Sequence, residues 1–174
     1  MGIAASQARY LYLTARQTNV EFEGQQINQA RTNLANEQAG LFRKMLEIKS
    51  PTVPTMYGIQ EKCTAWGDKG PDRKDYNDDA SYQRDYDIWS IYQSSGINAA
   101  YDYAMDQYNA DKDAYEKTMD EINAKSEEIH QRDQVLELQL RQLDTEQQTI
   151  VTELESVKKV IDKNIEIVFK TFQS

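Results

Sequence analysis

A chain of 174 residues has the size of one ordinary domain, so the sequence calls for no second domain. Its hydrophobic fraction is 39% and its charged fraction is 28%, a balance that favours a long helical protein with narrow apolar seams over a globular domain. Because 29 acidic residues outnumber 20 basic ones, the net charge of -9 has the wrong sign for binding phosphate backbones, and we expect no nucleic-acid partner.

We also expect neither a membrane-spanning segment, nor a cleaved signal peptide, nor cysteine-based cross-links. The apolar runs are far shorter than the roughly 20 residues that cross a bilayer, so we expect no transmembrane segment. The first residues lack the basic and apolar regions of a secretory signal peptide, which argues against a cleaved signal but leaves other export routes open. Cys63 is the single cysteine, so we expect neither an intrachain disulfide nor a cysteine metal site.

The first helix is predicted over residues 1–49. One apolar residue recurs there every seven positions, which indicates a helix with one buried seam, at Leu13, Val20, Ile27, Leu34, Leu41 and Ile48. Helical geometry is disfavoured for the residue before a proline, so we expect this helix to end at Ser50 and Pro51.

The middle of the chain, residues 50–96, is predicted to be a loop followed by a short helix. All three prolines and three glycines fall between Pro51 and Asp79, which predicts the loop. A helix follows over residues 80–93, with aromatic side chains spaced as on one helical face. These aromatic residues have two interpretations, packing onto the long helix or a candidate partner surface, and the second would use Tyr57, Trp66, Tyr82, Tyr86 and Trp89.

Residues 97–174 are predicted to form one long coiled-coil helix, from about Ile97 to Phe172. A second series of apolar residues seven apart runs through it, namely Tyr101, Tyr108, Tyr115, Ile122, Ile129, Leu136, Leu143, Ile150 and Val157. No proline follows Pro71 and no glycine follows Gly96, so nothing commands a break. At 1.5 Å per residue the helix would be about 110 Å long, and it needs a partner along most of its length.

The two seams together predict the fold class. It is all-α, a long helical hairpin or coiled coil in which the N-terminal helix packs on the C-terminal one, in the same chain or in a neighbour. We treat the chain as one domain overall. The residues predicted to carry assembly are Leu13, Val20, Ile27, Leu34, Leu41, Leu136, Leu140, Leu143, Ile150, Leu154, Val157 and Ile161.

Polar residues stand at some of the second set of core positions of the long helix, three residues before members of its seven-residue series, at Ser126, Asp133 and Gln147. A polar residue inside a seam can fix the register or the number of helices. The alternative is that this stretch is exposed or loosely paired, and the sequence leaves the two interpretations equal.

The sequence contains part of a calcium-binding motif and a loose match to a lipidation motif. Asp75, Asn77 and Asp79 have the spacing of the first calcium ligands of an EF-hand, but Ala80 and Tyr86 stand where glycine and glutamate are required. Gly2 followed by Ser6 fits the loose myristoylation pattern, although one acyl chain anchors only weakly and no basic cluster assists it.

A catalytic site is not expected either. His130 is the single histidine, and no nucleophile elbow, zinc-protease, phosphate-loop or dinucleotide motif occurs. We therefore expect no enzyme, no cofactor and no metal.

A short segment resembles a known family. Residues 32–44, which include Asn33, Leu34, Ala35 and Asn36, are similar to the N-terminal signature of bacterial flagellar rod, hook and hook-associated proteins. The resemblance implies export without signal cleavage, terminal helices paired in a filament core and a middle region that projects outward. Leu41 between Gly40 and Phe42, and Ala39 near the expected threonine, depart from the signature.

Two functions follow as hypotheses. The first is a structural, self-assembling helical protein, a subunit of a bacterial surface or axial filament located outside the cell. The alternative is a cytoplasmic coiled-coil adaptor or export chaperone that binds a partner helix. In both, the partner is a second copy or another helical protein. A peripheral membrane protein anchored at Gly2 is a third class.

Overall fold

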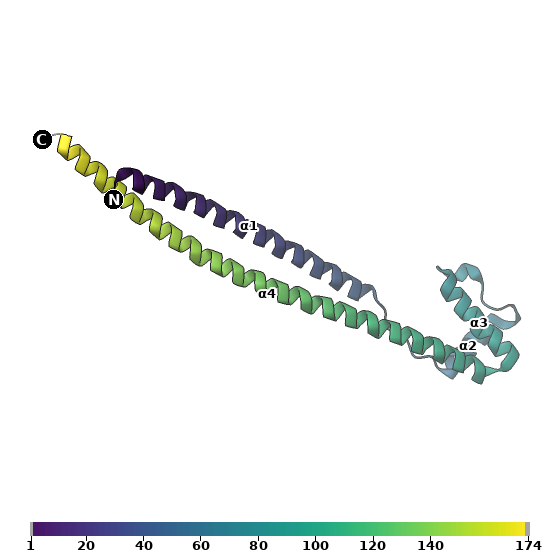
Figure 1. The fold of residues 1–174 in the computed structure, drawn as a ribbon. Coiled ribbons are helices and arrows are strands. Elements are labelled where there is room, and N and C mark those ends of the chain that lie inside the picture. The colour runs from purple at the N-terminus through teal and green to yellow at the C-terminus, as the bar shows by residue number, and fades with distance from the viewer. Residues whose placement is uncertain (1, 173–174) are drawn as a thin grey trace. The chain divides into compact units, whose positions relative to one another are not determined.

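The computed structural model describes residues 2–172, and all the regular structure in that range is helical. Its elements are α1 (Ile3–Glu47), α2 (Met56–Trp66), the 3-10 turns η1 (Gly67–Lys69) and η2 (Arg73–Asp75), α3 (Asp79–Ser95) and α4 (Ile97–Phe172) (Figure 1). The all-α class is confirmed, and α4 has the predicted bounds.

Contacts divide the chain into two compact units, whereas the sequence suggested one domain. The first, the hairpin unit, contains Met1–Phe42 and Ala124–Ser174. The second, the three-helix unit, contains Arg43–Asn123, and its helices are α2, α3 and the first part of α4.

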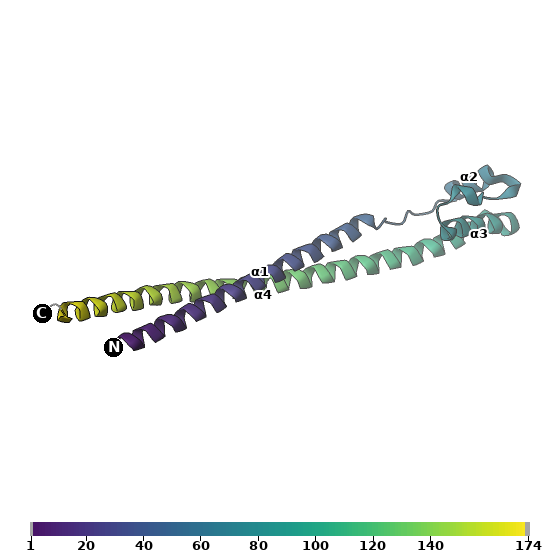
Figure 2. The ribbon, with the colours of Figure 1, turned by 90° about the horizontal axis from the view of Figure 1, so that it is seen from above.

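In the hairpin unit α1 lies antiparallel along α4 (Figures 1 and 2). Arg9 pairs with Glu153 at 3.6 Å and Arg16 with Glu146 at 2.8 Å, so seven residues forward on α1 correspond to seven residues back on α4. The core is a cluster of Leu13, Val20, Ile150 and Val157, with Leu143, Leu154 and Ile161 packed against it. The predicted packing of the N-terminal helix on the C-terminal helix is confirmed.

The first complete helix of the three-helix unit, α2, was not predicted from the sequence. Thr55 caps α2, its side-chain oxygen accepting a hydrogen bond from the Gly58 amide at 3.1 Å, because the first amides of a helix lack partners within it. Ile59 and Cys63 of α2 then reach the core. The loop expected over Pro51 to Asp79 is therefore corrected for residues 56–66.

The core of the three-helix unit combines small residues and Ile59 with isoleucine and aromatic side chains packed around them. Cys63 is 1% exposed and Ala100 is fully buried, and Trp66, Trp89 and the other partly buried residues pack around them. Burial raises the pKa of the Cys63 thiol. Ala100 and Ala104 are the residues that α4 contributes to the buried cluster with Ile59 and Cys63 of α2.

Candidate interaction surfaces

All twelve predicted assembly residues lie in the hairpin unit, and seven of them pack together in its apolar core. The most buried of them are Leu13, Val20, Leu41, Ile150 and Val157. The others are half-buried, namely Ile27, Leu34, Leu136, Leu140, Leu143, Leu154 and Ile161. The sequence left open whether the two seams meet in one chain or between chains, and in the hairpin unit they meet in one chain.

Polar side chains bond across the hairpin beside the apolar seam. Arg31 donates two hydrogen bonds to the carboxylate of Asp133, at 2.7 and 3.0 Å, and Gln38 donates to the Ser126 hydroxyl at 2.8 Å. The bond from Arg31 is the main reason that the pKa of Asp133 is lowered. Ser126 and Asp133 thus have partners on α1, which supports the interpretation that they set the register.

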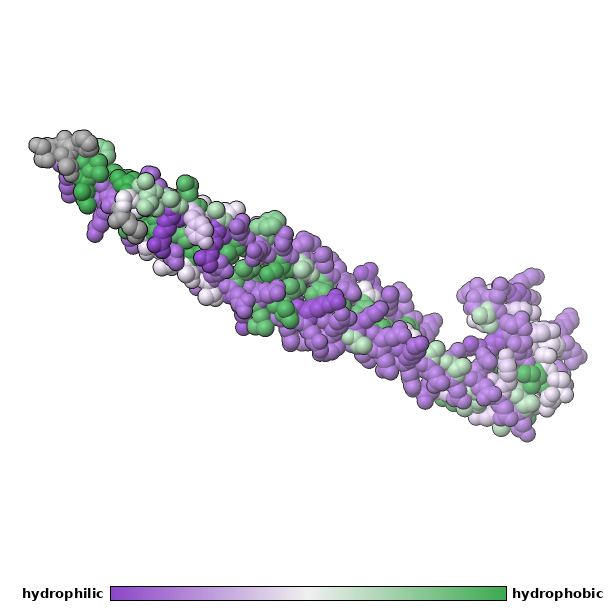
Figure 3. Space-filling model, in the orientation of Figure 1, coloured by the Kyte–Doolittle hydropathy of each residue, from purple (hydrophilic) through white to green (hydrophobic). Residues whose placement is uncertain are grey.

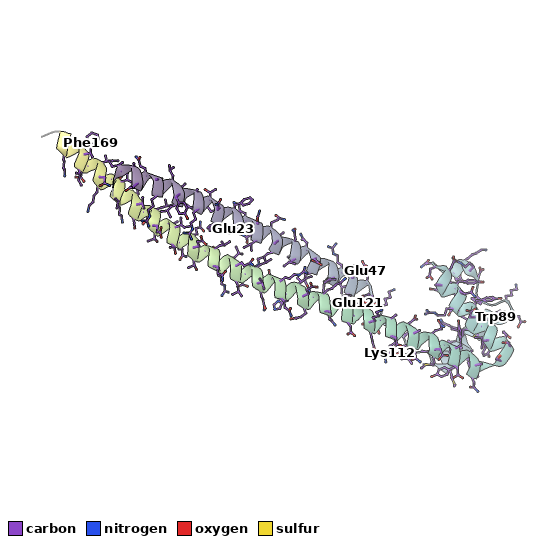
Figure 4. The ribbon with its side chains drawn as sticks, in the orientation of Figure 1. Glu23, Glu47, Trp89, Lys112, Glu121 and Phe169 are labelled. Carbon is purple, nitrogen blue, oxygen red and sulfur yellow. The ribbon has the colours of Figure 1, made fainter. Side chains whose placement is uncertain are left out.

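The aromatic residues of the middle region pack mainly on one another. The Trp89 indole N–H donates to the Gly67 carbonyl at 2.9 Å, and ring contacts link Tyr82 to Tyr86 and Tyr86 to Trp89, with centroids 5.9 and 5.6 Å apart. Figure 4 labels Trp89 on α3. Of the five residues of the candidate partner surface, Tyr57 is the most exposed, at 76%.

The terminal end of the hairpin carries apolar side chains on its surface. α1 begins at Ile3, and because Arg9 lies opposite Glu153, the antiparallel register uses up α1 near residue 160. α4 continues to Phe172 past the start of α1 (Figure 1). These last turns of α4, residues 162–169, are named the overhang, and Figures 3 and 4 show apolar surface and the labelled Phe169 there. Large exposed side chains at this end are Tyr10, Leu11, Tyr12, Val160, Ile165, Ile167, Val168 and Phe169.

A groove of about 720 Å³ opens in the three-helix unit. The non-helical segment of residues 48–55 forms one wall and residues 104–118 of α4 form the other. Its apolar lining includes Ile48, Pro51, Ile88, Tyr108 and Tyr115.

Four charged residues of the groove form two ion pairs, and Lys49 also lines it. Arg84 donates to both carboxylate oxygens of Asp111, at 2.7 and 3.2 Å, and Lys62 lies 3.5 Å from Asp85.

Sequence reasoning missed both the groove and the overhang. The apolar residues that continue after Val157 were a signal for the overhang. What was lacking was the register, because only the register shows that α1 has no residues left to cover them. The groove had no signal of its own, since it depends on the path of residues 48–55.

The polar motifs do not come together as a site. His130 is exposed and bonds to Gln134 at 3.0 Å, while Asp79 pairs with Arg73. Within residues 2–172 no group of three or more His, Cys, Asp or Glu side chains is placed to hold a metal ion. In the same range no helix has the length and apolar character needed to span a membrane.

The fold and these surfaces define an all-α protein built on an antiparallel helical hairpin. Comparison of the chain with models of protein families, with curated proteins and with solved structures finds no match.

Proposed function

We propose that this chain is a structural protein that assembles with further copies of itself through helix–helix contacts. The observation that carries the proposal is the apolar terminal end of the hairpin, where Leu11, Ile165 and Phe169 are 68%, 41% and 66% exposed. Large exposed apolar patches with polar rims mark interaction sites. Because the seam itself is used within the chain, assembly uses these outer residues.

A subunit of a bacterial axial or surface filament is the specific form of this proposal. Paired terminal helices around a chemically different middle are the layout that the resemblance at residues 32–44 implies. In the hairpin unit Leu34 is half-buried while Asn33 and Asn36 are exposed. The exposure of the two asparagines supports this form of the proposal, because it leaves their side chains available for contacts with neighbouring subunits.

The test is light scattering with negative-stain microscopy of the full chain over a wide concentration range. Growth of the scattering mass with concentration and visible filaments are the expected result. Ile165→Asp with Phe169→Asp should abolish growth without loss of helical circular dichroism, because both residues are exposed. The matched control is Val135→Asp with Leu138→Asp, which changes two exposed residues elsewhere on α4 and should leave assembly intact.

An adaptor or export chaperone is the second candidate function. It is favoured by three exposed apolar residues at the start of α2, because Val53, Met56 and Tyr57 are 60%, 47% and 76% exposed. Such a cluster suits the capture of a partner helix. A discrete oligomer that does not grow at any concentration would replace the filament proposal with this one.

A further inference from the structure

The side of α1 that faces away from α4 carries a second, largely apolar stripe. Its members are all exposed and recur in alternating steps of four and three residues, at Ala4, Ala8, Leu11, Ala15, Thr18 and Phe22. We name them the back stripe, because each lies two residues from a buried position of α1 and two residues turn a helix by about 200°. Leu11 and Phe22 are 68% and 59% exposed. Steps of four and three are the spacing of a coiled-coil seam, so this face suits another helix.

The back stripe lies in a stretch of α1 that is almost free of charge. Between residues 2 and 20 the charged residues are Arg9 and Arg16 alone, and both pair with α4, through Glu153 and Glu146. The cores of protein interfaces are depleted in charged residues, whereas helices that lie on membranes present Lys and Arg on their polar face. The charge pattern therefore favours a protein partner over a lipid surface.

Side-chain sizes along the back stripe are complementary to a second copy of it. In an antiparallel pair of back stripes centred on residue 13, the numbers of facing residues add up to 26. The facing pairs are then Leu11 with Ala15, Phe22 with Ala4, and Ala8 with Thr18. Each large side chain thus meets an alanine, which lets the two helices interdigitate. Parallel pairing would instead place the two copies of Phe22 against each other.

Charge favours the same orientation. Glu21 and Glu23 flank the end of the back stripe, and Figure 4 labels Glu23 on α1. Antiparallel pairing brings them to residues 5 and 3 of the second copy, where its α1 begins. The first turn of α1 has no acidic residue of its own, and the N-terminus of a helix attracts negative charge. Parallel pairing would bring the glutamates of the two copies together.

We infer that two copies of this chain pair through their back stripes, antiparallel about a two-fold axis near residue 13. The inference rests on the proposed function, because it specifies one contact of the assembly. A two-fold contact is closed and makes dimers, so growth beyond the dimer needs the terminal contact of Ile165 and Phe169.

The first test determines the orientation by cross-linking. Ala8→Cys and Thr18→Cys, both at exposed positions, are made in separate full-length chains and mixed under mild oxidation. We expect a disulfide between the two variants, because these positions face each other. Two Ala8→Cys chains should not link, since ten residues separate their positions along the paired helices, which is about 15 Å. The native Cys63 is buried, and oxidised wild type gives its background.

The second test weakens the contact. Ala15→Arg places a charge against Leu11 of the second copy, and the two-fold axis repeats it. We expect the dissociation constant of the dimer, measured by analytical ultracentrifugation, to rise at least about hundredfold, tenfold for each copy. Ala124→Arg is the matched control, because Ala124 is exposed on α4 in the same unit and lies outside the back stripe. It should dimerise like the unchanged chain.

Both changes are made in the chain that carries Ile165→Asp and Phe169→Asp, which does not grow under the proposed function. The dimer is then measured without larger assemblies. Circular dichroism should show the same helical content in both variants.

Failure of the inference can be told apart from failure of the proposed function. Disulfides mainly between identical variants would overturn the antiparallel pairing. Equal dimerisation of Ala15→Arg and Ala124→Arg, with the wild type still growing, would reject the back stripe and leave the proposed function in place. A dimer weakened by Ala15→Arg, from a wild type that never grows, would uphold the inference and reject the filament. A monomer at every concentration that sediments with phosphatidylcholine vesicles would assign the back stripe to lipid.

Discussion

At the scale of single residues, two glycines respond oppositely to an added methyl group. Gly70 has φ +73°, and a Cβ there would lie 3.0 Å from the Trp89 ring. Gly24 lies inside α1, and a Cβ there would meet no atom within 4 Å. Gly70 therefore needs the positive φ that glycine adopts easily. Gly24 has no such need, and as a glycine it only costs more backbone entropy on folding.

We expect Gly70→Ala to lower the free energy of unfolding of the three-helix unit by about 1–3 kcal/mol, the cost of a backbone conformation that is nearly restricted to glycine. Gly24→Ala should raise that of the hairpin unit by about 0.5–1 kcal/mol. Urea unfolding followed by far-ultraviolet circular dichroism and tryptophan fluorescence measures both. Equal effects of the same sign would contradict the assignment.

At the scale of the helices, two leucines of α1 differ in burial, because one lies in the apolar seam and the other on the surface. Leu13 is 2% exposed and Leu11 is 68% exposed. Leu13→Ala should destabilise the hairpin by about 2–5 kcal/mol, because it leaves a cavity in the core. Leu11→Ala serves as the control and should change the free energy of unfolding by less than about 0.5 kcal/mol. Chemical denaturation at a concentration below the onset of assembly measures the difference.

The pair of Arg31 and Asp133 predicts a pH dependence of the hairpin. Because the folded state lowers the pKa of Asp133, the unfolded state binds the proton more tightly. The stabilisation is therefore fully present above the unfolded pKa of about 3.9, and it is lost as pH falls through the lower folded pKa.

Asp133→Asn should remove that part of the pH dependence. Urea midpoints measured between pH 7 and pH 2 should fall less steeply below about pH 4 in this variant than in the wild type. Asp144→Asn, an exposed position on the same helix, is the control and should retain the wild-type slope. A wild-type slope in Asp133→Asn would show that Arg31 does not stabilise the carboxylate.

The helices differ in how far their sequences predicted them. Regular spacing of apolar residues indicated α1 and α4, because a long helix repeats its buried positions many times. α2 was missed because prolines and glycines surround it, although Ile59, Cys63 and Trp66 recur with helical spacing after the Thr55 cap. Periodicity finds long seams and is weak for a helix of 11 residues.

The pairing of the seams could not be predicted from their periods. Any shift of seven residues keeps apolar residues opposite one another, so the series alone permits several registers. The bond between Arg31 and Asp133 distinguishes these registers only after the partner helix is known. For the same reason, the overhang and the groove could not be predicted.

At the scale of the whole molecule, the two units have separate cores and separate spectroscopic reporters. The chain has two tryptophans, and Trp66 and Trp89 both belong to the three-helix unit. Fluorescence therefore reports on that unit alone. Circular dichroism includes the hairpin unit, which contains most of α1 and the latter part of α4.

We expect Leu13→Ala to lower the denaturant midpoint measured by circular dichroism while the fluorescence midpoint stays at its wild-type value. The reason is that Leu13 belongs to the hairpin core and contributes nothing to the core around Cys63. Gly70→Ala is the reciprocal control and should move the fluorescence midpoint. If both probes shift together in both variants, the units unfold as one cooperative block.

The antiparallel pairing in the hairpin also governs how the chain folds during synthesis. Arg16 and its partner Glu146 are separated by 130 positions. At 5–20 residues per second, a ribosome needs roughly 6–26 s to add that many residues. During this interval Leu13 and Val20 have emerged while Ile150 does not yet exist. The apolar stripe of α1 therefore has to wait for its partner on α4 before it becomes the core of a hairpin.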